Sequence, residues 1–280
     1  MPLNSVNTNT DAALALQNLN NTNAQISTVQ NQVNTGLAIS SAKDNGAVWA
    51  IAQSQRAQVA SLGSVVQSLQ RGQSAVDVAL SAGQTVSDLL VQIKTKVLAA
   101  SDTSLNTSAR QALNNDFKSL LNQITTVVDN ANFNGVNLLV TGAQSYQALA
   151  NADATQTITV KAQSLTLGGA NLLGLSNTSS FNTATQANGF ITSVNNAIQN
   201  VSTALGALGT GSNALGAQLN FVNNLSDTLN TGIGNLVDAD LAAASARLQA
   251  LQTKQQLGVQ ALSIANTESS TLLSLFRNIG

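Results

Sequence analysis

The chain has 280 residues, of which 8% are charged, against roughly a quarter in ordinary soluble proteins, and its formal net charge is −1. It therefore lacks the basic surface that would hold nucleic acid or an anionic membrane. It contains no histidine and no cysteine, and only 3% of its residues are aromatic. This composition excludes imidazole catalysis, thiol chemistry and most zinc or iron sites. We expect no enzyme, no cofactor and no metal site.

The rest of the composition favours long helices that pack closely. Most hydrophobic residues are Ala, Val and Leu, and the only proline is Pro2, so no later residue interrupts a helix as proline does. The polar residues are mainly neutral amides and hydroxyls, which lack the like-charge repulsion that keeps proteins apart. Residues 1–39 contain no lysine, no arginine and no cleavable apolar segment. We expect a chain that packs against copies of itself and has no conventional secretory signal.

Hydrophobic spacing predicts three helices in the first half of the chain. Leu19, Ile26 and Val33 are seven residues apart, which is a helical repeat. A longer stripe with steps of three and four extends from about residue 47 to residue 100, and another from residue 113 to residue 131. Between these two stripes, residues 101–104 break the pattern and offer N-cap side chains for the third helix.

Turn and strand signals separate the two helical halves. Asn134-Gly135 is a strong turn signal because both residues tolerate positive φ. Residues 155–160 alternate polar and apolar side chains and are predicted to form a strand, with residues 164–167 as its neighbour. The Ser/Thr/Asn-rich run from Ser176 to Thr185 is predicted to be an exposed loop.

The second half contains the clearest periodic signal. Apolar residues recur every seven positions at Val194, Val201, Leu208, Leu215, Val222, Leu229 and Leu236, and a companion position is held by Ile191, Ile198, Leu205, Leu219 and Ile233. This repeat predicts one long helix in a coiled-coil-like bundle. After residues 238–240, another stripe predicts a C-terminal helix that pairs antiparallel with the N-terminal one. The expected fold is mainly α: a long antiparallel coiled-coil-like bundle from both chain halves, with a small central β-hairpin region.

The paired ends are predicted to need other subunits. Their apolar stripes bury too little surface to offset the backbone entropy lost when both helices become ordered. We therefore expect neighbouring copies to supply the missing contacts. The residues assigned to packing between terminal helices and between subunits are Leu19, Ile26, Val33, Leu241, Leu248, Leu262, Leu272 and Phe276.

Several motifs, in the same order along the chain, resemble those of the bacterial flagellins. Residues 35–52, TGLAISSAKDNGAVWAIA, resemble the stretch S-G-L-R-I-N-S-A-K-D-D-A-A-G-L-A-I-A, with a departure at residues 45–49. Residues 132–139, NFNGVNLL, resemble F-N-G-x-x-L-L. Residues 238–240 resemble D-A-D, and residues 272–277, LLSLFR, resemble the closing L-S-L-L-R. The chain is similar to short flagellins of the alphaproteobacterial type, which lack large outer domains.

The resemblance implies a structural subunit that self-assembles into the flagellar filament, a helical propeller for motility. Residues 1–44 and 236–280 would form a channel-lining inner core, and residues 45–235 an outer core bundle with a β-hairpin region at about 136–175. The implied partners are copies of the chain, hook-associated and cap proteins, the flagellar type III export apparatus and a chaperone of the C-terminal helix, but neither nucleic acid nor membrane. The implied location is the extracellular filament, reached without a cleaved signal peptide.

The residues leave two alternatives open. A hook–filament junction protein has similar helical ends, although that family typically has a P-S-D-D-P-like stretch in place of S-A-K-D, and no proline follows Pro2 here. The predicted loop at residues 176–185 is either plain solvent-facing chain or a site of O-linked sugar. The candidate hydroxyls for such a sugar are those of Ser176, Thr178, Ser179, Ser180, Thr183 and Thr185.

Overall fold

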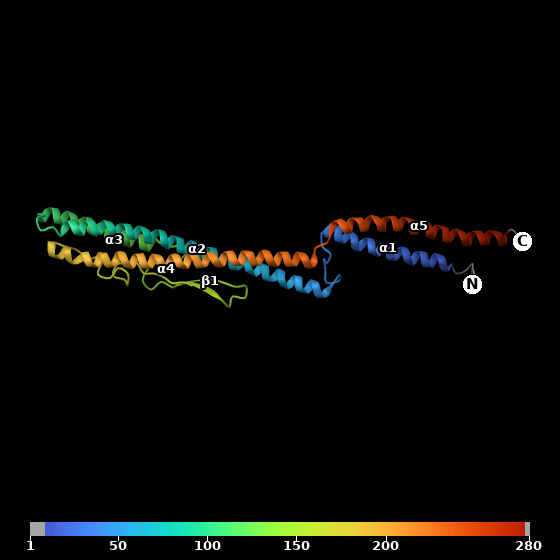
Figure 1. Ribbon diagram of the computed structural model, residues 1–280, viewed down its shortest axis with the longest axis horizontal. Coiled ribbons are helices and arrows are strands. Elements are labelled where there is room, and N and C mark those ends of the chain that lie inside the picture. The colour runs from blue at the N-terminus through green and yellow to red at the C-terminus, as the bar shows by residue number, and fades with distance from the viewer. Residues whose placement is uncertain (1–8, 278–280) are drawn as a thin grey trace. The chain divides into compact units, whose positions relative to one another are not determined.

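The computed structural model describes residues 9–277, and side chains as far as residue 267. This range contains five helices and two strands, in the order α1 (Thr10–Thr35), α2 (Gly46–Ala100), α3 (Thr107–Asn130), β1 (Tyr146–Leu149), β2 (Thr157–Val160), α4 (Ala184–Val237) and α5 (Leu241–Arg277) (Figure 1). The chain divides into two compact units, Gln58–Asp227 and the two ends, Met1–Ala57 with Thr228–Gly280. The predicted fold class is confirmed. None of the helices in the described range has the length and apolar content needed to cross a lipid bilayer.

Within the unit Gln58–Asp227, α2, α3 and α4 lie along one another and enclose an apolar core (Figure 1). Phe117 of α3 is fully buried, and its ring centroid lies 5.2 Å from that of Phe181 and 5.4 Å from that of Phe190 on α4. The predicted heptad positions of α4 from Val194 to Val222 are also fully buried. This bundle therefore buries its own apolar stripes.

The heptad register of α4 ends before the helix does. Leu236, the last predicted position, is 38% exposed, whereas Ile233 and Val237 are buried. Ile233 follows Val222 by eleven residues, a step that returns to the same helix face because the α-helix has about 3.6 rather than 3.5 residues per turn. The assignment of Leu236 to the buried stripe is therefore wrong.

The connection between α2 and α3 differs from the prediction. The N-cap of α3 is Asn106, not a residue of 101–104, and its side-chain oxygen accepts the Ala109 N–H at 2.8 Å. Arg110 is buried and donates to the carbonyl oxygens of Ala100, Asp102 and Leu105 at 3.1, 2.8 and 3.1 Å. Because α2 ends at Ala100, this guanidinium satisfies the last carbonyl of the helix and two carbonyls of the connection, at a helix C-terminus where the macrodipole favours a positive charge.

The strand prediction is right for one strand and wrong for its partner. β2 lies within the predicted segment 155–160, but it pairs antiparallel with β1, with Tyr146 opposite Val160. The predicted neighbour, residues 164–167, is not a strand, because the N–H of Leu165 bonds to the carbonyl of Leu139 instead. The Asn134-Gly135 turn is confirmed, with φ of 50° and 82° at the two residues.

Two glycines allow the hairpin to lie directly against the helices. A Cβ at Gly72 of α2 would lie 2.6 Å from Cε1 of Tyr146, and one at Gly211 of α4 would lie 2.7 Å from Cγ1 of Val160. The buried hydroxyl of Ser68 accepts the N–H of Leu149 at 3.1 Å. The hairpin is therefore held by close backbone approach as well as by apolar burial.

Candidate assembly surface

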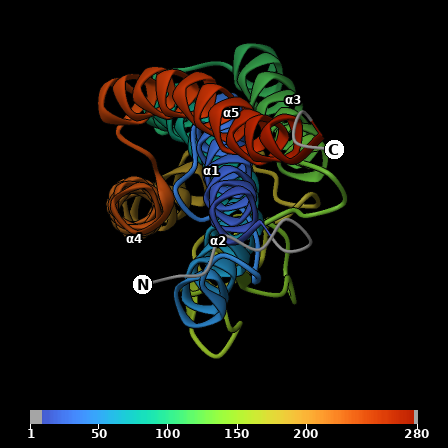
Figure 2. The same cartoon turned by 90° about the vertical axis from the view of Figure 1, so that its right-hand side faces the viewer.

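The two chain ends meet as an antiparallel helix pair, as predicted. Helices α1 and α5 run side by side (Figure 1), and Figure 2 views this pair from the right-hand side of Figure 1. Gly36 ends α1 with φ 72°, a conformation that glycine adopts without strain, and its carbonyl accepts the N–H of Ala239 at 2.9 Å. The N–H of Ala38 donates to the carbonyl of Val237 at 2.7 Å. These backbone bonds fix the register of the pair at the end where the two helices connect to the rest of the chain.

The half of the pair nearest this connection is well packed, and we call it the closed half. Side chains from both helices form one apolar cluster there, consisting of the buried Ile26, Val29, Ala244 and Leu251 and the half-buried Val33 and Leu248. Residues on each helix are three, four or seven apart, so a continuous stripe of one helix meets that of the other. This half resembles an ordinary two-helix seam.

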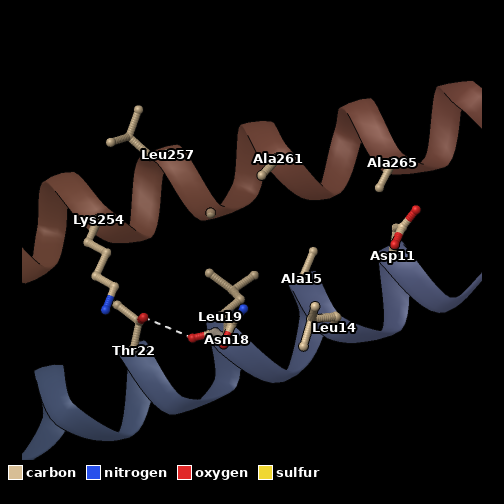
Figure 3. A pocket seen from close by; sticks show the side chains of 11 residues that line it. Asp11, Leu14, Ala15, Asn18, Leu19, Thr22, Lys254, Leu257, Ala261 and Ala265 are labelled. Atoms are coloured by element: carbon tan, nitrogen blue, oxygen red, sulfur yellow. Dashed lines mark hydrogen bonds between the residues drawn. The ribbon is translucent and has the colours of Figure 1, made fainter.

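The half nearest the chain termini contains a groove of about 460 Å³, and we call it the open half (Figure 3). The groove is lined in part by Ala15, Ala261 and Ala265, whose side chains are too short to fill it, and by Gly258, which has no side chain. Leu14 and Leu257 also line it, yet they remain 58% and 59% exposed. Figure 3 shows the charged side chains of Asp11 and Lys254 at opposite ends of the groove.

Polar contacts hold the two helices together beside this groove. The Asn9 side chain donates to the carbonyl of Ala265 at 2.8 Å, and that of Gln255 donates to Oδ1 of Asn23 at 2.6 Å. Thr22 is buried on the seam, with its hydroxyl donated to a carbonyl of its own helix at 2.9 Å. Hydrogen bonds can fix a register, but they leave the apolar surface of Leu14 and Leu257 in water.

The eight residues assigned to terminal packing lie in different environments. Ile26, Val33 and Leu248 meet in the closed half, and Leu19 lines the open half. Leu262 is half-buried, while Leu241, the first residue of α5, is exposed. The last two, Leu272 and Phe276, belong to the part of α5 whose side chains lie outside the described residues.

Sequence reasoning missed two features of this surface. Thr22 is buried on the seam, but threonine is polar and was therefore not counted in the apolar pattern. Its spacing of four residues from Ile26 was the signal that could have identified it. Leu257 was also missed, because it lies beside the predicted stripe and not on it.

The connection that leads from α1 to α2 contains a tightly bonded carboxylate. Asp44 Oδ2 accepts the backbone N–H and the hydroxyl of both Ser40 and Ser41, at distances from 2.9 to 3.1 Å. These bonds, that of the Ser40 hydroxyl first, hold the pKa of Asp44 below its usual range. The carboxylate is thus used to shape a turn. In the described part of the chain, no group of three or more acidic, His or Cys side chains is placed to hold a metal ion.

The predicted loop at residues 176–185 is shorter and more anchored than expected. Phe181 is fully buried, its N–H bonds to Oδ1 of Asn114 at 2.9 Å, and α4 already begins at residue 184. The candidate sugar acceptors divide accordingly. Ser176 and Ser179 are half-buried, Thr178, Ser180 and Thr183 are exposed in the loop, and Thr185 is exposed on the helix.

Comparisons with known proteins agree with this geometry. Residues 6–145 match the model of the bacterial flagellin N-terminal helical region, and residues 191–276 match that of the C-terminal helical region. Flagellin FljM of Caulobacter vibrioides is 56% identical over 277 residues, covering 99% of this chain and 100% of the relative. A flagellin of Brucella melitensis is 38% identical, covering 98% and 99% of the two chains. These matches give no support to the hook–filament junction alternative. The chain therefore belongs to the bacterial flagellin family, whose members are structural subunits that self-assemble into the extracellular flagellar filament and are not enzymes.

Proposed function

We propose that the chain polymerises through the open half of the α1–α5 pair, where a neighbouring copy fills the groove. The observation that carries this proposal is a groove of about 460 Å³, lined mainly by apolar residues, beside which Leu14 and Leu257 each remain more than half exposed. Full burial of an exposed leucine is worth roughly 1.5–3 kcal/mol, and burial of the part of Leu14 and of Leu257 that is still exposed is worth somewhat more than half of that each. A second copy that inserts apolar side chains between them would gain this free energy at every contact of the polymer.

The same proposal assigns a role to each part of the chain. Residues 1–44 and 236–280 form the inner core that lines the channel, and residues 45–235 form the outer core, with its β-hairpin region at about 136–175. The division of the chain into Gln58–Asp227 and the two ends supports a separation of this kind, with residues 45–57 and 228–235 grouped with the ends. In the assembled filament the outer bundle provides bulk and stiffness for motility, while the terminal pair provides cohesion.

Helix α5 also has the surface expected of a segment that needs protection before assembly. Val259 and Ile264 are 53% and 63% exposed, in addition to Leu257. Apolar side chains grouped on one helix favour aggregation unless a partner covers them. We include in the proposal a chaperone for this helix, delivery by the flagellar type III export apparatus, and hook-associated and cap proteins that meet the pair at the filament ends.

The O-linked sugar proposal narrows to Thr178 and Ser180. Both side chains are exposed in the loop, and the Thr178 hydroxyl bonds to that of Ser176 at 3.0 Å within the loop itself. The hydroxyl of Thr183, in contrast, accepts the N–H of Gln186 at 3.2 Å at the start of α4. A sugar on Thr183 would compete with this capping bond. Intact-mass measurement of filaments from their native source, before and after chemical removal of O-linked sugars, tests the assignment.

The variant Leu257→Asp tests the assembly proposal. Because Leu257 is exposed in the single chain, we expect the variant to fold with an unchanged circular dichroism spectrum. In a filament its carboxylate would be buried without a partner, so we expect electron microscopy to show no filaments. Leu257→Met retains the apolar volume and should polymerise. Thr178→Asp, in the exposed loop of the other unit, should also polymerise. Normal filaments from Leu257→Asp would contradict the proposal.

A further inference from the structure

The chain contains three Asn-Gly pairs, and the structure places them in three different environments. They are Asn45-Gly46, Asn134-Gly135 and Asn188-Gly189. In such a pair the backbone nitrogen of glycine can attack the side-chain carbonyl carbon of the asparagine, because glycine has no Cβ to obstruct the approach. Which pair reacts in the folded chain depends on how the backbone holds that nitrogen and that carbonyl.

Two of the pairs are held in ways that oppose this reaction. Asn188 and Gly189 lie inside α4, where the backbone N–H of each residue is used in the helical ladder. The N–H of Gly135 donates to Oδ1 of Asn132 at 2.8 Å. Asn134 is fixed at φ 50° between Phe133 and Val136, whose backbones exchange two bonds of 2.9 Å.

Asn45-Gly46 is held differently. Gly46 is the first residue of α2, so its N–H is one of the initial donors that receive no partner within the helix. Both residues are exposed, and a Cβ at Gly46 would meet no atom within 4 Å. Oδ1 of Asn45 accepts the N–H of Val48 at 3.2 Å. That N–H polarises the side-chain carbonyl and faces the oxygen on which negative charge develops during attack.

We propose that Asn45 is a site of spontaneous deamidation in the folded chain. The nitrogen of Gly46 loses its proton and bonds to Cγ of Asn45, and the Cγ–Nδ2 bond breaks to release ammonia. The resulting five-membered imide is opened by water. Cleavage of the bond between Cγ and the ring nitrogen gives Asp, whereas cleavage at the backbone carbonyl gives isoaspartate. The net change exchanges ammonia for water and needs no oxidant or enzyme.

The two products have opposite effects on the start of α2. Asp caps a helix about as well as Asn, and its charge is favoured by the helix N-terminus. It would also restore the second acidic residue of the S-A-K-D-D stretch that the chain otherwise lacks. Isoaspartate inserts an extra backbone atom before Gly46 and so displaces the cap. Either product adds one negative charge to the formal net charge of −1.

Peptide mapping provides a direct test. Trypsin cleaves after Lys43 and Arg56, so residues 44–56 form one peptide that contains Asn45 as its single asparagine and Trp49, the only tryptophan of the chain. The folded protein is incubated in mildly alkaline buffer, and a second sample is incubated in urea. The fraction of acidic product at Asn45, Asn134 and Asn188 is then measured over time by tandem mass spectrometry, which locates the mass change within peptides that hold several asparagines.

We expect Asn45 to deamidate several-fold faster than Asn134 and Asn188 in the folded chain, and all three to react at similar rates in urea. The matched control is Gly46→Ala, which adds a Cβ into open space and should slow the reaction at Asn45 without altering the fold. Faster reaction at Asn134 or Asn188 in the folded chain would overturn the proposal, as would an unchanged rate in Gly46→Ala. The relative deamidation rates of the three asparagines in the unassembled chain decide the proposal. The same measurement on filaments shows whether assembly covers Asn45.

Discussion

The three-helix bundle and the terminal helix pair have the same type of apolar repeat in their sequences, but they bury it to different extents. In the bundle, heptad residues such as Leu208 and large side chains such as Phe117 are fully buried. In the pair, only the closed half is packed, and the open half leaves Leu14 and Leu257 in water. The comparison indicates that a regular apolar stripe predicts a helix face that needs a partner, but does not say whether the partner is in the same chain.

Removal of one helix of the terminal pair is expected to have the largest effect, because it should abolish filament formation and leave the bundle folded. Removal of residues 1–40 or 240–280 deletes one helix of the pair and leaves the apolar core of Gln58–Asp227 intact. We expect a folded, soluble bundle that forms no filaments, measured by circular dichroism and electron microscopy. Filaments of normal appearance from either truncated chain would show that the pair is not the cohesive element.

A cavity introduced into the bundle core is expected to have the next largest effect, a loss of stability of the bundle. Phe117→Ala removes a ring that contacts two other aromatic rings, and we expect it to lower the free energy of unfolding of the bundle by about 3–5 kcal/mol. The matched change in the closed half of the pair, Leu251→Ala, should leave the unfolding midpoint of the bundle unchanged. Urea unfolding followed by circular dichroism measures both. Equal destabilisation of the bundle by the two variants would mean that the two units unfold as one.

Much of the fold follows from apolar spacing, because an apolar period near 3.5 that persists over many residues matches a packed helix, whereas a strand has a period of two. The long helices and the pairing of the chain ends were predictable in this way. The end of the α4 register at Leu236 was not, because the mismatch between 3.5 and about 3.6 residues per turn accumulates until an eleven-residue step corrects it. Strand β1 was also missed, since Tyr146–Leu149 carries no alternating β-branched pattern.

The open half could not be inferred from the sequence for a physical reason. Ala261 and Ala265 count as apolar residues in a periodic pattern, just as leucine does. Their side chains, however, are too small to fill the space between α1 and α5. A groove therefore remains where the pattern suggests a packed seam. Periodicity reports the direction of a side chain, whereas closure of a seam depends on its volume.

The smallest expected effect concerns the turn before α2. Because the pKa of Asp44 is lowered in the folded chain, its bonds stabilise the turn at pH values above the ordinary pKa of aspartate. That stabilisation is lost as the pH falls through the lower folded pKa. We expect the Ser40 and Ser41 amide resonances to titrate with a midpoint below the ordinary pKa of an aspartate that accepts no hydrogen bonds. A midpoint at the ordinary value would mean that the four bonds do not persist in solution.

Limited proteolysis of the single chain and of the filament tests the central claim most directly. If the open half is completed only by a neighbouring copy, residues 1–44 and 236–280 should be cleaved first in the single chain and protected in the filament, while the bundle resists cleavage in both. Mass spectrometry of the early fragments identifies the cut sites. Equal resistance of the terminal helices in the two states would contradict the account, because it would mean that the pair is already complete within one chain.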